Sequence, residues 1–179
     1  MLLCISCTSS SDKNSLPPSQ NEQSNIESPL KQSPETSLSY ENMECGYKLT
    51  FPESWLGYYI INDQRPNDMS IYFYGKSIAG TVIYEKIGCY GLPMFAIVNE
   101  DILNSGAFDS SIKIGTACGI NYYYVRFTGT DLNLLMNVAS GVYPDFDETE
   151  KQLAGEEWEK VEEMFNEIDI LLESFDPVD

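Results

Sequence analysis

The sequence contains no histidine among its 179 residues. This absence removes the most common general base, the usual nitrogen ligand of zinc and the histidine-dependent forms of the catalytic triad. No pair of cysteines at metal-ligand spacing lies downstream of residue 8, so a structural zinc site is not expected. We therefore expect a protein that is not an enzyme, with no catalytic residues, no cofactor and no bound metal.

Basic residues are scarce as well, because the chain holds 10 of them against 28 acidic residues and has a formal net charge of -18. Such a balance repels phosphate backbones and anionic lipid head groups, so we expect no nucleic-acid partner. The acidic charge is concentrated at 145–179, where 14 acidic residues accompany 2 basic ones. This end of the chain is interpreted as a solvated helix face, and the alternative is a surface for a cationic partner, such as an immunity protein presents to a basic toxin.

Long apolar runs are also missing, since none approaches the roughly 20 residues that span a bilayer. The 42% hydrophobic and 12% aromatic content is nevertheless enough for a core of its own. The length fits one domain of ordinary size together with a tail. Any contact with a membrane must therefore come from a lipid anchor.

The chain opens with a short apolar stub, 1–7, that ends at a cysteine and is followed abruptly by polar residues. The sequence Ile5-Ser6-Cys7 resembles the end of a bacterial lipoprotein signal. That resemblance implies that Cys7 is the lipid-attachment site and that the protein is extracytoplasmic, anchored to the bacterial cell membrane. Secretory signals have an apolar region of about 7–15 residues after a positive start, whereas only six residues precede Cys7 and Cys4 stands where leucine is usual. We expect the natural start to lie upstream; a cytoplasmic protein with an apolar start is the alternative.

Residues 8–39 are rich in Ser, Pro, Asn, Gln and Glu and include no aromatic residue. Such a segment cannot bury enough apolar surface to offset the entropy lost on ordering. We therefore expect a disordered tether over 8–39, followed by a single domain over 40–179.

Short runs of aromatic and β-branched residues, separated by turn formers, follow residue 40. Their period of two is typical of half-buried strands, and the short polar connections favour an antiparallel meander of about five to seven strands. The expected strands are 47–51, 56–61, 69–74, 79–87, 94–98, 113–117 and 121–127, the last two forming a hairpin, with a loop or short helix at 99–109.

The period changes near the carboxyl end, where apolar residues recur every three or four positions. This spacing predicts one helix with an apolar stripe, which we expect to pack on the sheet of the same chain as a monomer. A coiled-coil seam with another chain is the alternative. The predicted fold class is therefore α+β, an antiparallel β-sheet packed by a long C-terminal helix. The stripe is Trp158, Val161, Phe165, Ile168, Leu172 and Phe175.

Two stretches of this domain carry a family resemblance. Residues 46–57, with the run Phe51-Pro52-Glu53-Ser54-Trp55, look like the opening strand and turn of PsbP-like domains, and 164–175 is similar to their closing helix. The resemblance covers about 43–176 and implies a binding or assembly-assisting module. It carries over no functional residue, because Pro52 is expected to end the strand and Trp55 to fill the core.

The candidate binding residues are tyrosines on two of the expected strands. Tyr72 and Tyr74 share one face of their strand, as do Tyr122 and Tyr124, which predicts an aromatic platform for a glycan or peptide. The alternative is that tyrosine is frequent here because of its β-propensity.

Acidic and sulfur side chains give weaker signals. The acidic run 145–150 does not fit the EF-hand pattern, and Asp147 or Thr149 is expected to cap a helix. Cys45, Cys89 and Cys118 are expected to be buried thiols, although one disulfide stays an alternative.

Together these features predict a surface-tethered lipoprotein whose domain is a non-enzymatic module that binds a protein or a cell-surface component. The alternative is an acidic inhibitor or immunity protein that neutralises a basic toxin. The salt dependence of binding distinguishes the two, because steered binding to a cationic partner weakens strongly as ionic strength rises.

Overall fold

The computed structural model describes residues 35–65, 68–75, 77, 83, 86, 92–105, 108, 110–127 and 133–178. These residues form two antiparallel sheets and a long helix near the carboxyl end, which confirms the predicted α+β class. The strands are β1 (Ser39–Asn42), β2 (Tyr47–Thr50), β3 (Tyr59–Arg65), β4 (Asp68–Phe73), β5 (Leu92–Asn99), β6 (Ile112–Ala117), β7 (Ile120–Arg126) and β8 (Asp176–Pro177). The helices are the short 3-10 helix η2 (Glu53–Trp55), α2 (Glu100–Leu103), α3 (Leu134–Ala139), α4 (Glu148–Asn166) and α5 (Ile168–Glu173).

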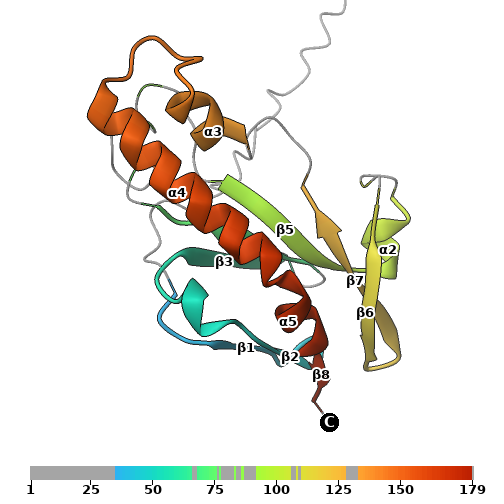
Figure 1. Ribbon diagram of the computed structural model, residues 1–179. Helices are drawn as coiled ribbons and strands as arrows, with labels where there is room; N and C mark the ends of the chain where they lie inside the picture. Colours follow the sequence, from blue (N-terminus) through green and yellow to red (C-terminus); the bar gives the residue numbers. More distant parts are fainter. Residues whose placement is uncertain are drawn as a thin grey trace, which may run out of the picture.

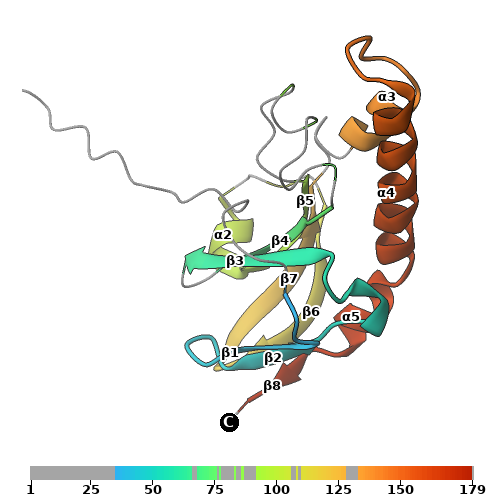
Figure 2. The ribbon, with the colours of Figure 1, turned by 90° about the vertical axis from the view of Figure 1, so that its left-hand side faces the viewer.

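The five-stranded sheet has the order β3-β4-β5-β7-β6, and the three-stranded sheet has the order β1-β2-β8. Figure 1 shows α4 running across the larger sheet toward α5 and β8, so that the carboxyl end finishes beside β2. Figure 2 shows α4 on one side of the larger sheet and α2 on the other. Both faces of this sheet are therefore covered, each by a different part of the chain.

The main apolar core lies on the face toward α4 and the smaller sheet. In β4 the buried residues Met69, Ile71 and Phe73 alternate with half-buried ones, as a strand of period two requires. The central strand β5 is instead buried along almost its whole length. The opposite face of the five-stranded sheet carries a second, smaller cluster that α2 helps to cover. This cluster consists of Ala96 and Val98 of β5 and Val125 of β7.

The turn between β6 and β7 consists of Cys118 and Gly119, with φ values of 49° and 77°. A two-residue hairpin turn with positive φ at both positions matches the right-handed twist of the strands. The predicted hairpin is confirmed, with Ala117 opposite Ile120.

The Pro52–Trp55 turn is structural, as the sequence predicts. Trp55 is fully buried, and its indole N–H donates a hydrogen bond to the Glu167 carboxylate at 3.0 Å. The Ser54 hydroxyl donates to the same carboxylate oxygen. Glu167 thus joins the turn to the point where α4 ends and α5 begins.

The single C-terminal helix predicted from the sequence is wrong in two respects. The helix is interrupted at Glu167, and Phe175 lies beyond α5. The buried side of α4 is made of Ala154, Glu157, Val161 and Met164, so the predicted stripe is rotated and places Trp158 and Phe165 at its half-buried margin.

The start of α4 is fixed by a capping box. The Asp147 side chain accepts from the Glu150 backbone N–H, and the Glu150 side chain accepts from the Asp147 N–H, each at 2.8 Å. The predicted capping role of Asp147 is confirmed, and Glu150 is the second member of the pair.

The strand predicted at 79–87 and the end of the tether predicted at 8–39 differ from the structure where it describes them. Most of the strand predicted at 79–87 lies outside the described residues, and the two described residues, Ile83 and Lys86, are helical. The tether predicted at 8–39 lies outside them up to residue 34. Its last part is ordered, because the Glu35 N–H donates to the Tyr59 carbonyl at 2.9 Å and β1 begins at Ser39.

Candidate functional site

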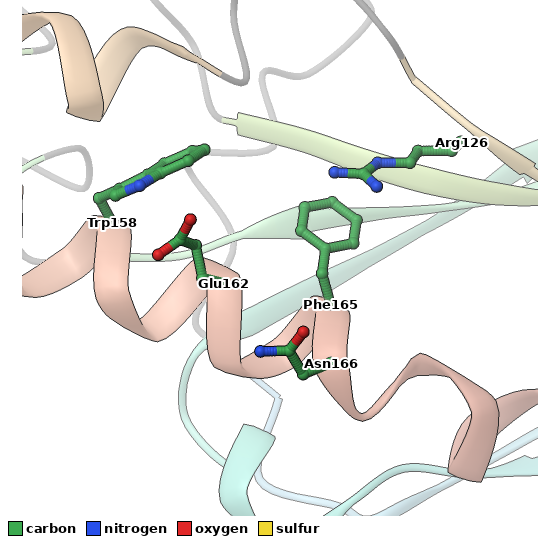
Figure 3. A pocket seen from close by; sticks show the side chains of 5 residues that line it. All are labelled: Arg126, Trp158, Glu162, Phe165 and Asn166. Carbon is green, nitrogen blue, oxygen red and sulfur yellow. The ribbon is translucent and has the colours of Figure 1, made fainter.

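A pocket of about 350 Å³ lies between β7 and α4. We call it the Arg126 pocket, and Figure 3 shows its side chains from both elements. Its volume falls at the lower end of the range for small-molecule and side-chain sites. The pocket is lined by Arg126, Trp158, Glu162, Phe165 and Asn166.

Strand register explains why Arg126 reaches this pocket. Arg126 lies opposite Phe95, a member of the main core, so its side chain leaves the sheet on the face toward α4. The guanidinium carbon stands 4.0 Å from the centre of the Phe165 ring, a cation–π contact that holds the charge over α4. Arg126 is an exposed residue, which suits a residue that meets a ligand.

The helix supplies the remaining groups of the pocket. Trp158 and Phe165 lie at the half-buried margin of α4, while Glu162 and Asn166 are exposed. Each of these four residues lies three, four, seven or eight positions from at least two of the others, so their side chains share one side of the helix. Trp158 and Phe165 therefore offer apolar walls, and Glu162 and Asn166 offer polar groups beside them (Figure 3).

Within the part of the chain that the structure describes, the side chains of Arg126, Glu162 and Asn166 form no hydrogen bond or ion pair. Three lysines on or against α4 are engaged differently, since Lys86 pairs with Glu150, Lys151 with Glu148 and Lys160 with Glu163. The Arg126 guanidinium can donate two parallel hydrogen bonds to a carboxylate. The Glu162 carboxylate can accept hydrogen bonds from an ammonium group or an amide N–H. The pocket thus presents complementary polar groups next to aromatic surface.

Tyr124 lies on β7 below Arg126 and shows how the local charges act. Burial raises the pKa of Tyr124, Arg126 opposes that rise, and Asp169 adds to it. The phenol therefore stays neutral at physiological pH and supplies no negative charge to pair with Arg126.

The aromatic platform predicted from four tyrosines is not formed. Tyr122 is 1% exposed and Tyr124 is 7% exposed, so their rings belong to the core and cannot contact a partner at the surface. Tyr72 and Tyr74 are half-buried, and the register places Tyr72 on the opposite face of the sheet from Tyr124. The prediction fails because alternation along a strand shows which residues share a face but not which face is covered.

Two features of the sequence point to this pocket, although the many tyrosines in the strands favoured a different site. Arg126 is one of only two arginines in the chain and stands at the end of an aromatic strand. Glu162 and Asn166 follow Trp158 at helical spacing, a polar continuation that a fully buried stripe would not have.

The acidic run at 145–150 is used for local structure. Asp147 and Glu150 form the capping box, and Lys86 pairs with Glu150 at 3.1 Å while lying over the Phe146 ring. Among the described residues, no group of three or more acidic or cysteine side chains is placed to hold a metal ion.

The proposed lipid-attachment residue, Cys7, lies outside the described residues. No helix in the described ranges is long and apolar enough to cross a membrane.

Comparisons of the chain with protein-family models, curated proteins and solved structures find no match. The PsbP-like resemblance of 46–57 and 164–175 stays a prediction.

Proposed function

We propose that the chain is a surface-tethered, non-enzymatic binding module that holds a segment of a partner protein in the Arg126 pocket. The tether is the polar segment that begins at residue 8 and ends before the ordered residue Glu35, anchored through lipid on Cys7. The observation that carries the proposal is the exposed Arg126, whose guanidinium lies over the Phe165 ring and forms no hydrogen bond or ion pair with another described side chain.

A charge of this kind is unusual in so acidic a protein. In a chain with a formal net charge of -18, Arg126 shares its pocket with the Glu162 carboxylate, yet among the described residues its guanidinium forms no ion pair. Stacking on Phe165 holds its planar group in place and reduces the entropy lost on forming new hydrogen bonds. Arg126 is thus preorganised for a carboxylate that comes from outside the chain.

The remaining lining residues define the other features of the ligand. Glu162 disfavours a simple anion and favours a ligand that also carries a cationic or amide N–H group. Trp158 and Phe165 favour an apolar or aromatic side chain between those two polar groups. A peptide segment with an acidic residue, an apolar residue and a basic residue meets all three requirements.

The test uses acetylated, amidated tripeptides of the form Asp-X-Lys, with X apolar or aromatic, and matched Asn-X-Lys peptides. We expect weak binding of at least one Asp peptide, and Arg126→Gln should lower its affinity about tenfold or more, because charged hydrogen bonds are lost. Isothermal titration calorimetry measures both affinities.

The matched control is Lys113→Gln, which removes the same charge from an exposed residue on β6. Lys113 lies opposite Tyr123, on the face away from α4, and should leave the affinity unchanged. Equal binding of the Asp and Asn peptides, or no binding by any peptide, would contradict the proposal.

The acidic-inhibitor alternative rests on the exposed glutamates of α4, which include Glu156, Glu159 and Glu163. Binding through those residues would fall steeply with ionic strength and would not require Arg126. A partner with that behaviour would support the alternative instead.

The tether is tested separately, by fatty-acid labelling of the protein expressed with its native upstream DNA. We expect a labelled protein, and we expect the label to be lost in Cys7→Ala. Protein that carries no label in either form would contradict the lipid anchor.

A further inference from the structure

Two cysteines far apart in the sequence occupy neighbouring hairpin turns. Cys45 lies in the turn between β1 and β2, where its backbone N–H donates to the Asn42 side chain at 2.9 Å. Cys118 is the first residue of the turn between β6 and β7. The first turn belongs to the smaller sheet and the second to the larger one.

The two turns meet at Gly46, the residue after Cys45. A Cβ placed on Gly46 would lie 2.5 Å from Cys118 Sγ and 3.9 Å from Cys118 Cβ. The Cys118 side chain therefore rests directly on the Gly46 backbone, one residue from Cys45. Because neighbouring Cα atoms are about 3.8 Å apart, rotation of both cysteine side chains and a small movement of the turns can bring the sulfurs together.

A second observation agrees with this placement, because both thiols lie near the same phenol. Tyr122, on β7, is buried, and after burial the groups that raise its pKa are Cys45 and Cys118. Both sulfurs thus act on the same phenol from the two turns.

Exposure and backbone geometry give the two cysteines different roles. Cys118 is exposed, which corrects the prediction of a buried thiol, whereas Cys45 is 5% exposed. Cys118 also has a φ of 49°, a left-handed conformation that disfavours residues other than glycine and asparagine. A strained, exposed thiol beside a second thiol is a candidate for chemistry.

We propose that Cys45 and Cys118 form a disulfide that joins the two sheets when the protein meets a disulfide oxidant. In the structure both are thiols. The proposal does not depend on the Arg126 pocket.

The reaction is thiol–disulfide exchange with a small-molecule disulfide. The Cys118 thiolate attacks one sulfur of the oxidant, forms a mixed disulfide and releases the first small thiol. The Cys45 thiolate then attacks Cys118 Sγ and releases the second. Each cysteine loses one proton, one new S–S bond joins them, and the oxidant is reduced to two thiols by two electrons.

The test treats the reduced, folded chain with oxidised glutathione, blocks remaining thiols with N-ethylmaleimide and maps tryptic peptides without reduction. Trypsin separates the domain cysteines, because Cys45 falls in 32–48, Cys89 in 87–113 and Cys118 in 114–126. We expect a linked 32–48 and 114–126 pair in the wild type and in Cys89→Ser, and its loss in Cys118→Ser.

A second measurement separates a native link from chance pairing. The same oxidation in concentrated guanidinium chloride should give at least tenfold less of this pair relative to the other pairings. Reduction of the linked protein should lower its melting temperature by on the order of 10 °C, because the link restricts the unfolded chain.

Three results would contradict the proposed disulfide. A stable glutathione adduct on Cys118 with no link to Cys45 would overturn the proposal. So would a dominant link to Cys89, or equal amounts of the Cys45–Cys118 pair from folded and denatured protein.

Discussion

Single atoms decide how the carboxyl end is attached to the domain. Gly115 lies in β6 directly under the Phe175 ring, and a Cβ at this position would lie 2.3 Å from Phe175 Cδ1. Phe175 in turn stacks on Tyr47 of β2, with ring centres 5.3 Å apart. The absence of a side chain at Gly115 therefore lets the chain after α5 close over both sheets.

We expect Gly115→Ala to destabilise the protein by about 1–3 kcal/mol, because the Phe175 ring must move away from packed neighbours. The matched control is Gly155→Ala in α4, where the new Cβ would meet Ala139 Cβ at an ordinary 3.7 Å. That change should stabilise the protein by about 0.5–1 kcal/mol, since alanine favours the helix. Urea unfolding measures both, and equal effects would contradict the close approach at Gly115.

At the scale of elements, the junction of α4 and α5 is joined to the η2 turn through one carboxylate. Glu167 accepts hydrogen bonds from the Ser54 hydroxyl and from the indole of the fully buried Trp55. A buried donor that loses its acceptor costs about 1–3 kcal/mol. Glu167 therefore sets the place where the helix changes direction relative to the smaller sheet.

Glu167→Ala should lower the free energy of unfolding by about 2–3 kcal/mol, because both donors lose their acceptor. Glu163→Ala, one turn earlier, removes a half-exposed side chain paired with Lys160 and should change stability by less than about 1 kcal/mol. Unfolding followed by tryptophan fluorescence compares the two. A similar loss in both variants would show that the contact with Trp55 contributes little.

The elements that the sequence predicts best are those with a regular pattern and a buried face. The alternation of 69–74 and the turn at Cys118 and Gly119 correspond closely to β4 and to the β6–β7 hairpin. β1 and β8 escape prediction because one is a polar edge strand and the other is only two residues long. The break at Glu167 also escapes it, since it depends on side chains from a distant turn rather than on glycine or proline.

For the whole molecule, the candidate site depends on which faces are covered, and that information is not local. The pattern shows that Tyr122 and Tyr124 share a face, but only packing by the smaller sheet and α4 buries that face. The same packing leaves Arg126 exposed at the margin, where its guanidinium contacts Phe165 and where Trp158 lines the same pocket from the helix. The composition predicts a core, an acidic helix and a tail, whereas the pocket arises from the contact between strand and helix.

The two tryptophans of the chain allow a direct test of whether a partner segment binds at the Arg126 pocket. Trp158 lines the pocket, whereas Trp55 is buried and bonded to Glu167, so each indole N–H reports on a different place. Titration of ¹⁵N-labelled protein with the Asp-X-Lys peptides should shift the Trp158 indole signal and leave the Trp55 signal in place. Arg126→Gln should abolish the shift and Lys113→Gln should preserve it. A Trp158 signal that does not respond to any peptide, or that responds equally in Arg126→Gln, would contradict binding at the Arg126 pocket.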